Sequence, residues 1–344
     1  MKKFLVSLFL FCSVFTFSQK REMVEAFSKH NFDKTIEIGQ EILKSQPDDF
    51  ETILMIARAE DEKGSFKNAL PYLEKAKTLM KEDWQKSWTF LEIAKNNFGT
   101  GNLEIAKQNY EEATKITGTK NSMKSIRNFG LLSGLDEFYK NWTVRESKNL
   151  IFHFENGINQ KEIERIVTTR QMAFEEINSF FNSNMPKKID FFVWNLNESF
   201  NPVLNKNLGF SIPIFSISHS RFNQTPGHEI AHNISFWRNS QIIKTQLINE
   251  GIGVCFDQQK NDKLKIAQEV YKNNPIDIKE IWKNNSPVND DILYPIAGAF
   301  VEYLIKYDKE KFLKLSENQT YENAIKLYDG RIDEIIEKFN FEMK

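Results

Sequence analysis

The sequence contains few residues that could cross-link or kink the chain. Among its 344 residues are two cysteines, Cys12 and Cys255, together with 14 glycines and 9 prolines. Because Cys12 lies in an N-terminal segment that we expect to be removed, the mature chain should lack an internal disulfide. Stability must then come from packing, and 344 residues, of which 40% are hydrophobic, suffice for two domains.

A marked excess of charge of either sign is also absent. The chain has 46 basic and 47 acidic residues, which gives a formal net charge of -1. Domains that bind nucleic acids normally carry a basic excess, so we expect no nucleic-acid partner. The proportions of hydrophobic and charged residues, 40% and 27%, are those of a soluble globular protein.

Long hydrophobic runs are missing as well. The most apolar segment, Phe4–Phe17, follows two lysines and is shorter than the about 20 residues that a membrane-spanning helix needs. A positive start, an apolar centre and the small residues Thr16 and Ser18 are typical of a secretory signal peptide. We predict a signal peptide at residues 1–18 and a mature chain without a membrane span, exported to the periplasm or the medium. An uncleaved membrane anchor is the alternative.

The part of the chain that follows contains an internal repeat. The segment His30–Thr35 (HNFDKT) matches Gly64–Ala69 (GSFKNA) at an offset of 34 residues, and Gly101–Ala106 (GNLEIA) matches both less regularly. Throughout residues 22–116, apolar and polar residues interleave at helical spacing. A period of 34 residues, with a Gly-x-apolar turn and small residues within each helix, resembles the tetratricopeptide repeat.

The resemblance implies an all-α array of tetratricopeptide-like helical repeats at residues 19–118, followed by a connecting or capping helix at residues 119–142. Small residues such as Ala57 and Ala76 would let paired helices approach closely, and the turn glycines would adopt angles that other residues avoid. Three copies are near the minimum for a stable stack. The array offers a concave surface for a peptide or protein partner, or it is a scaffold for the next domain; both remain open.

From residue 143 onward, short strands alternate with helices. Strands are predicted at Leu150–Phe154, Ile189–Trp194 and Phe210–Ser218. A strongly helical pattern covers Glu162–Phe181, and Pro213 favours an edge position for the third strand. The chain reads as helical again after Gln246. We therefore predict an α+β domain over residues 143–344, so that the whole protein is multidomain.

The segment His228-Glu229-Ile230-Ala231-His232 carries the most specific chemistry. Thr225 and Pro226 before it predict the N-cap and first turn of a helix. Two histidines four residues apart lie on one face of that helix and can bind one zinc ion at about 2.0 to 2.1 Å. Glu229 lies about 100° further round the helix, where it can act as a base on a water activated by the metal.

A third candidate ligand, Glu250, lies eighteen residues after His232 within LINEGIG at residues 247–253. His-Glu-x-x-His followed by Asn-Glu-Gly resembles the gluzincin branch of zinc metallopeptidases, in the thermolysin and aminopeptidase superfamily. The departures are Leu247 where Trp is usual and Gly253 where Ala is usual. The resemblance implies a zincin-like (gluzincin) metallopeptidase fold for residues 143–344. It also implies one zinc ion (Zn2+) held by His228, His232 and Glu250, with Glu229 as the general base.

Other residues near the motif leave alternatives open. Peptidases of this superfamily place an oxyanion donor on a later helix, and the resemblance assigns that role to Tyr294, at the start of YPIAGAFV. The alternative is a tyrosine that packs on the core. His219 either lines the cleft or is an ordinary polar residue at a strand end. Cys255 is predicted to be a small buried hydrophobe that points away from the ligands.

These features predict an exported zinc-dependent peptidase that hydrolyses peptide bonds in a peptide or protein substrate. The helical repeats would bind the substrate or a protein partner. The segment Gly209–Pro213 lacks the Gly-x-Met-Glu-Asn-type pattern that holds the substrate amine in related aminopeptidases, which favours an endopeptidase. The predicted edge strand could pair with an extended substrate. The alternative is an inactive peptidase-like scaffold for protein interactions, and the intact Glu229 argues against it.

Overall fold

The computed structural model describes residues 18–195, 200–240 and 243–344. It divides the chain into two compact units, Met1–Phe138 and Tyr139–Lys344. The signal peptide predicted at residues 1–18 lies, except for its last residue, outside the described residues. None of the helices in the described ranges has the length and apolar character needed to cross a membrane.

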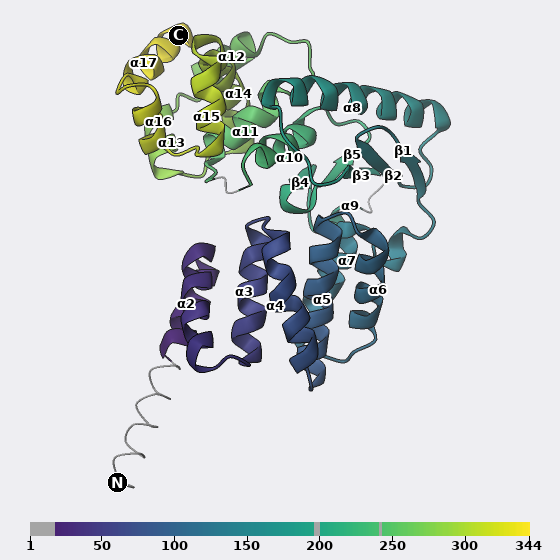
Figure 1. Cartoon of the computed structure of the whole chain (residues 1–344). Helices are drawn as coiled ribbons and strands as arrows, with labels where there is room; N and C mark the ends of the chain where they lie inside the picture. Colours follow the sequence, from purple (N-terminus) through teal and green to yellow (C-terminus); the bar gives the residue numbers. More distant parts are fainter. Residues whose placement is uncertain (1–17, 196–199, 241–242) are drawn as a thin grey trace, which may run out of the picture. The chain divides into compact units, whose positions relative to one another are not determined.

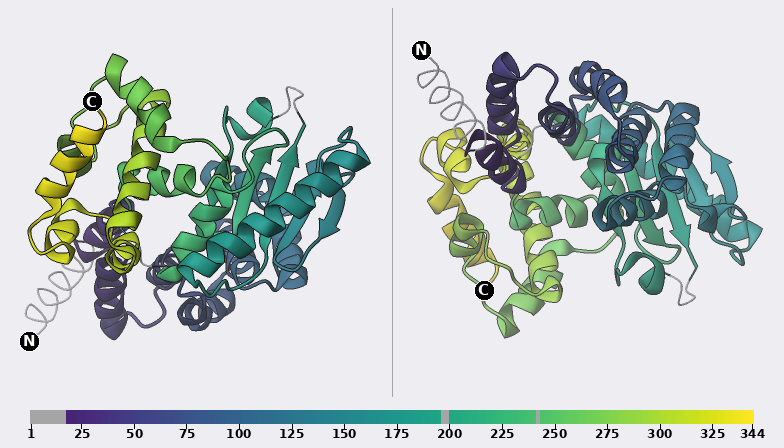
Figure 2. Two further views of the ribbon diagram at one scale, coloured as in Figure 1. Left: turned by 90° about the horizontal axis from the view of Figure 1, so that it is seen from above. Right: turned by 90° about the horizontal axis from the view of Figure 1, so that it is seen from below.

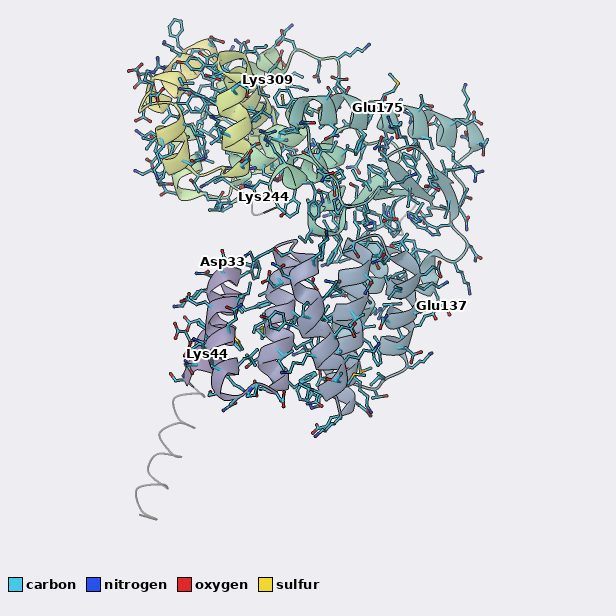
Figure 3. All side chains as sticks on the ribbon, viewed as in Figure 1. Asp33, Lys44, Glu137, Glu175, Lys244 and Lys309 are labelled. Carbon is cyan, nitrogen blue, oxygen red and sulfur yellow. The ribbon has the colours of Figure 1, made fainter. Side chains whose placement is uncertain are left out.

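The first unit consists of consecutive helices, each packed against its neighbour (Figure 1). After a helical segment at residues 18–28, they are α2 (Phe32–Ser45), α3 (Phe50–Glu62), α4 (Phe66–Leu79), α5 (Asp83–Gly99), α6 (Leu103–Thr114) and α7 (Lys120–Ser133). Asp33 and Lys44, labelled in Figure 3, lie in the first and last turns of α2, where their charges suit the helix dipole. The structure therefore confirms an array of helical repeats, while its tetratricopeptide character stays a prediction.

The turns of this array recur at the positions where the sequence repeats. Gly64 and Gly101 have φ angles of 75° and 84°, a left-handed conformation that glycine adopts without strain. His30 occupies the equivalent turn in the first copy with a φ of 56°. Between the turns, Ala57 and Ala76 are fully buried, so that neighbouring helices approach closely. The repeat in the sequence thus corresponds to a repeat of turn and contact geometry.

The second unit contains a five-stranded mixed sheet in the described part of the chain. Its order is β1 (Thr143–Glu146), β2 (Leu150–Phe154), β3 (Ile189–Trp194), β5 (Ile217–Arg221) and β4 (Phe210–Ile212). The three central strands are parallel, and β1 and β4 pair antiparallel at the two edges. The long helix α8 (Gln160–Phe181) lies across one face of this sheet (Figure 2). Its exposed side carries residues such as Glu175 (Figure 3). An α+β unit is therefore confirmed, whereas the zincin fold is a finer assignment.

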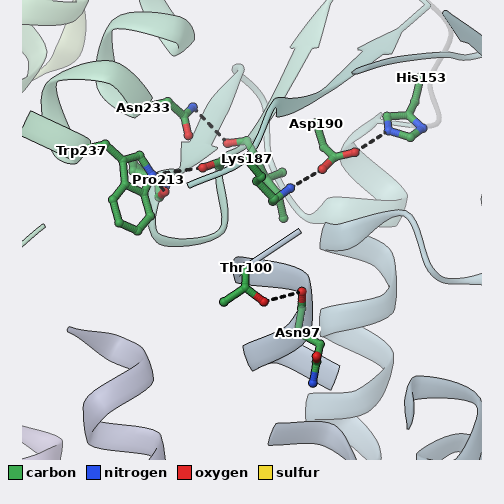
Figure 4. Close-up of polar contacts among 10 residues, drawn as sticks. Asn97, Thr100, His153, Lys187, Asp190, Pro213, Asn233 and Trp237 are labelled. Carbon is green, nitrogen blue, oxygen red and sulfur yellow. Dashed lines mark hydrogen bonds and ion pairs between the residues drawn. The ribbon is translucent and has the colours of Figure 1, made fainter. Parts of the chain in front are cut away.

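The single strand predicted over Phe210–Ser218 is wrong. Pro213 has no N–H to donate to a ladder, and it begins a 3-10 turn, Pro213–Phe215, that reverses the chain. The two halves pair with each other as β4 and β5, so that only β4 lies at the edge of the sheet. Trp237, on α10 (His228–Arg238), donates from Nε1 to the Pro213 carbonyl at 2.8 Å and holds this turn (Figure 4).

The face of the sheet away from α8 carries a ladder of stacked rings. His153, Phe192, His219 and Phe210 come from four adjacent strands and occupy directly paired positions. Successive ring centroids lie 4.3, 4.5 and 4.9 Å apart. Trp194 donates from Nε1 to His219 Nδ1 at 3.1 Å. His219 is therefore fully buried in the sheet, and it does not line a cleft.

The rest of the second unit is helical and contributes most of its hydrophobic core. Besides α10 and a short α9 (Phe200–Leu204), the helices are α11 (Gln246–Cys255), α12 (Lys263–Asn273), α13 (Ile278–Asn284), α14 (Asp290–Tyr307), α15 (Lys309–Glu317), α16 (Tyr321–Leu327) and α17 (Ile332–Glu342). α11 and α14 cross closely because glycines lie at the contact. A Cβ on Gly251 would lie 2.6 Å from the Ala297 carbonyl oxygen, and one on Gly298 would lie 2.4 Å from Val254 Cγ1.

Asp190 is a charged residue buried in the sheet, bonded to Lys187 and to His153 Nε2, the latter at 2.9 Å (Figure 4). Burial alone would raise the pKa of Asp190, but the charge of Lys187 and the hydrogen bond with His153 lower it overall. Because its folded-state pKa lies below the unfolded value of about 3.9, this carboxylate stabilises the fold above that pH. The stabilisation is lost as the pH falls through the folded-state pKa.

We predict that Asp190→Asn lowers the free energy of unfolding at pH 7 by about 3 kcal/mol, because it removes one charge of a buried pair. The difference from the wild type should shrink below about pH 4. Urea unfolding followed by circular dichroism measures both effects. Asp329→Asn, which removes an exposed partner of Lys311, is the control and should leave stability unchanged. Equal stability of Asp190→Asn and the wild type at pH 7 would contradict the prediction.

Candidate metal centre

The helix that carries the histidines starts later than its sequence suggests. α10 begins at His228 with Gly227 as its N-cap, so the N-cap predicted at Thr225 is wrong. Gly227 packs against the end of α11, where its N–H donates to the Asp257 carbonyl at 3.3 Å. A Cβ on Gly227 would lie 1.9 Å from the Phe256 carbonyl oxygen. This long-range contact sets the start of the helix, because only glycine fits there.

The structure brings His228, His232 and Glu250 together, as the sequence predicts. The two Nε2 atoms lie 3.1 Å apart, and each lies 3.6 Å from Glu250 Oε2. Tetrahedral zinc with ligands at about 2.1 Å would require them to lie roughly 3.4 Å from one another. The donor set and its spacing therefore fit one metal ion of the zinc class.

Glu250 interacts electrostatically with both histidines in the absence of a metal. Burial alone would raise the pKa of Glu250, but the contacts of its carboxylate with both histidines hold that pKa well below its usual range. Burial would lower the pKa of His228, whereas Glu250 and Glu229 raise it overall. Asn249 Nδ2 donates to Glu250 Oε1 at 3.0 Å, which leaves Oε2 for the histidines. A metal ion would replace the histidine proton in this arrangement, so binding should release protons.

Glu229 is not a member of the three-residue cluster, and it is 8% exposed. Its Oε2 is buried without a hydrogen-bond partner among the described residues. A buried carboxylate oxygen normally has a partner, so this position calls for a water molecule or a ligand group. Burial raises the pKa of Glu229, and the nearby histidines partly oppose that rise. Glu229 therefore lies beside the three clustered residues without being one of them.

A cavity of about 270 Å³ opens beside the cluster and includes His228, Glu229 and Tyr294 in its wall. Tyr294 lies in the second turn of α14, not at the helix start, because Asn289 caps the helix by accepting from the Asp291 N–H at 2.9 Å. Its ring stacks on that of His228, with centroids 5.7 Å apart and planes at 24°. Burial and the charge of Glu250 raise the pKa of Tyr294, so its hydroxyl keeps its proton.

Two glycines border the site closely, in a role that the sequence alone did not predict. A Cβ on Gly253 would lie 2.6 Å from Cε1 and 2.7 Å from Nε2 of His228. The sequence indicated a special role for Gly253 only in that alanine is usual at this position in gluzincins. A Cβ on Gly209 would lie 3.1 Å from Glu229 Oε1. Both glycines keep space for a side chain of the site. Cys255 packs partly buried against the hydrophobic core, and burial raises the pKa of its thiol to about 12.

No protein-family model matches the sequence, and no curated protein matches it at a significant level. The gluzincin and tetratricopeptide assignments therefore rest on the residues themselves and remain predictions.

We predict that the chain lacking residues 1–18 binds about one zinc ion and that Glu250→Ala weakens this affinity sharply. The loss should exceed the about 10- to 100-fold typical of removing an outer-shell partner, because a direct ligand is removed. Competition with a chromophoric chelator measures the affinity. Glu302→Ala, at a partly exposed carboxylate paired with Lys306, is the control. Equal zinc affinity of Glu250→Ala and the wild type would exclude Glu250 as a ligand.

Gly253→Ala should also weaken zinc binding, here by displacing the His228 ring rather than removing a ligand. We expect a loss of about 10- to 100-fold, the range seen when ligand orientation is disturbed. The circular dichroism spectrum should not change, since alanine favours a helix more than glycine does. If the variant binds zinc as tightly as the wild type, the ring of His228 does not depend on this contact.

Proposed function

We propose that this chain is a zinc-dependent peptidase of the gluzincin type, with His228, His232 and Glu250 as ligands of one zinc ion. The proposal is carried by one observation. A three-donor cluster with the spacing of a zinc site borders, through His228, a cavity that is also lined by Glu229, whose buried carboxylate has an oxygen without a partner among the described residues. Structural zinc sites usually have four protein ligands, whereas catalytic ones have three and an open position.

The chemistry follows from the groups around the cavity. A zinc ion bound there would polarise a water molecule and the carbonyl of a peptide substrate. Glu229 would accept a proton from that water and pass it to the leaving amine. Its pKa, raised by burial, suits a group that must both take up and release a proton. Tyr294, still protonated, would donate a hydrogen bond to the carbonyl oxygen as it gains charge.

The edge strand β4 adjoins this cavity through Gly209. An extended peptide would pair with β4 by strand addition, with its main chain directed past Glu229. Ile217 belongs to the interior strand β5 and is fully buried, so the strand that takes part is β4 alone. Because Gly209–Pro213 lacks the amine-binding pattern of aminopeptidases, we propose endopeptidase activity.

The rest of the chain fits an exported enzyme of this kind. Residues 1–18 have the layout of a signal peptide, which would take the protein to the periplasm or the medium. The helical repeats would bind a protein substrate or a partner on their concave surface. In the alternative function, an inactive exported scaffold for protein interactions, the same repeats would act alone.

We predict that Glu229→Gln lowers kcat/KM for peptide cleavage by about 10² to 10⁴, because the amide cannot act as a base. Zinc content should stay the same. A library of internally quenched peptides, incubated with the zinc-loaded chain, identifies a substrate and measures the rate. Glu269→Gln, at an exposed position on α12, is the control.

Two outcomes would contradict the proposal. Equal cleavage by Glu229→Gln and the wild type would exclude Glu229 as the base. A wild-type chain that binds zinc but cleaves nothing in the library would favour the scaffold. Once a substrate is known, N-methylation of the peptide bonds that flank the cleaved bond should slow cleavage, since it removes donors used in strand addition.

A further inference from the structure

The turn between β5 and α10 forms part of the cavity wall and is unusually well anchored at Gln224. The N–H of Gln224 donates to the Arg221 carbonyl at 3.0 Å. In return, the N–H of Arg221 donates to Gln224 Oε1 at 2.8 Å, and Ser220 Oγ lies 3.3 Å from the same oxygen. Because a main-chain N–H can only donate, the atom that faces it must be the amide oxygen of Gln224. The orientation of the amide group is therefore determined.

Arg170 on α8 donates from a terminal guanidinium nitrogen to the main-chain carbonyl of Gln224 at 3.2 Å. Arg170 is fully buried, and its guanidinium lies 5.1 Å from the centre of the Phe191 ring. Its other two nitrogens have no hydrogen-bond partner in the described part of the chain. A buried guanidinium with one hydrogen bond and no carboxylate costs stability. Folding alone therefore does not account for an arginine at this position.

The contacts above leave one polar group of Gln224 to be explained, its NH2. The N–H, the carbonyl and Oε1 all have partners, and no hydrogen bond involves Nε2 among the described residues. Gln224 lines the same cavity as His228, Glu229 and Tyr294. It also lies close to the general base, because a Cβ on Gly209 would be 2.8 Å from Gln224 Oε1 and 3.1 Å from Glu229 Oε1. A donor of fixed orientation thus stands beside the proposed reaction site.

We propose that Gln224 is a substrate-binding residue whose NH2 group donates a hydrogen bond to a main-chain carbonyl of the bound peptide. Arg170 is its positioning residue, since it holds the Gln224 carbonyl without reaching the cavity wall. The neighbouring residues that line the cavity, Ser220 on β5 and Asn223 and Thr225 in the turn, are polar and uncharged. This part of the site therefore selects for a peptide main chain rather than for a charged side chain. The inference rests on the proposed peptidase function.

Two zinc-binding probes test the inference on the zinc-loaded chain without residues 1–18. Acetohydroxamic acid reaches only the metal, whereas an N-acylated tripeptide hydroxamate also occupies the cavity. Gln224→Met, which keeps the length of the side chain but has no donor, should weaken the tripeptide hydroxamate about three- to tenfold, the value of one neutral hydrogen bond. Affinity for acetohydroxamic acid and for zinc should not change. Gln268→Met is the matched control, because that amide bonds to the Glu342 carbonyl outside this cavity.

A second pair of variants separates loss of the donor from loss of the turn. Gln224→Glu keeps an oxygen for the Arg221 N–H but has no NH2, so it should weaken the tripeptide hydroxamate as Gln224→Met does. Arg170→Met should also weaken it, while resistance to urea stays equal or increases, because an unpaired buried charge is removed.

Wild-type affinity of Gln224→Glu for the tripeptide hydroxamate would overturn the donor role. A stable Arg170→Met variant with unchanged affinity would overturn the positioning role. If the wild type takes up zinc but binds neither hydroxamate, the proposed function fails, and the peptide ligand assigned to Gln224 fails with it.

Discussion

The site depends on the contact between α10 and α11. Both histidines lie on α10, but neither can hold a metal with three ligands until α11 brings Glu250 to 3.6 Å from each of them. The contact is close because Gly253 has no side chain where the His228 ring lies, and because Gly227 packs directly on the end of α11. Although they have no functional group, the glycines at these two positions therefore determine the geometry of the candidate metal site.

A second close contact links α11 to α14. Gly251 and Gly298 let α11 and α14 cross with almost no side chain between them. As a result, Tyr294 stacks on His228 and borders the cavity together with Glu229. The three candidate ligands, Glu229 and Tyr294 come from three helices, and their relative positions follow from two helix contacts. A change that separates these helices would disturb several of these groups at once.

Around the cavity, polar groups are buried in ways that reduce stability. Glu229 has an oxygen without a partner, and Arg170 has two nitrogens without one, among the described residues. Such groups are rare in protein cores, because each costs free energy that the fold must supply elsewhere. Glu229 lines the cavity, and Arg170 is linked to it through the Gln224 carbonyl. At both residues, local stability is given up for a charged group held in place.

The sequence by itself determined the features that depend on local spacing. A period of 34 residues indicated the helical array, residues four apart placed His228 and His232 on one helix face, and Glu250 was a recognisable third candidate ligand. Only the tertiary structure decided the reversal at Pro213, the start of α10 and the anchoring of Gln224 by Arg170. These depend on contacts between residues far apart in the chain, such as the 54 positions between Arg170 and Gln224. Local periodicity carries no information about such contacts, because they form only when separate elements pack together.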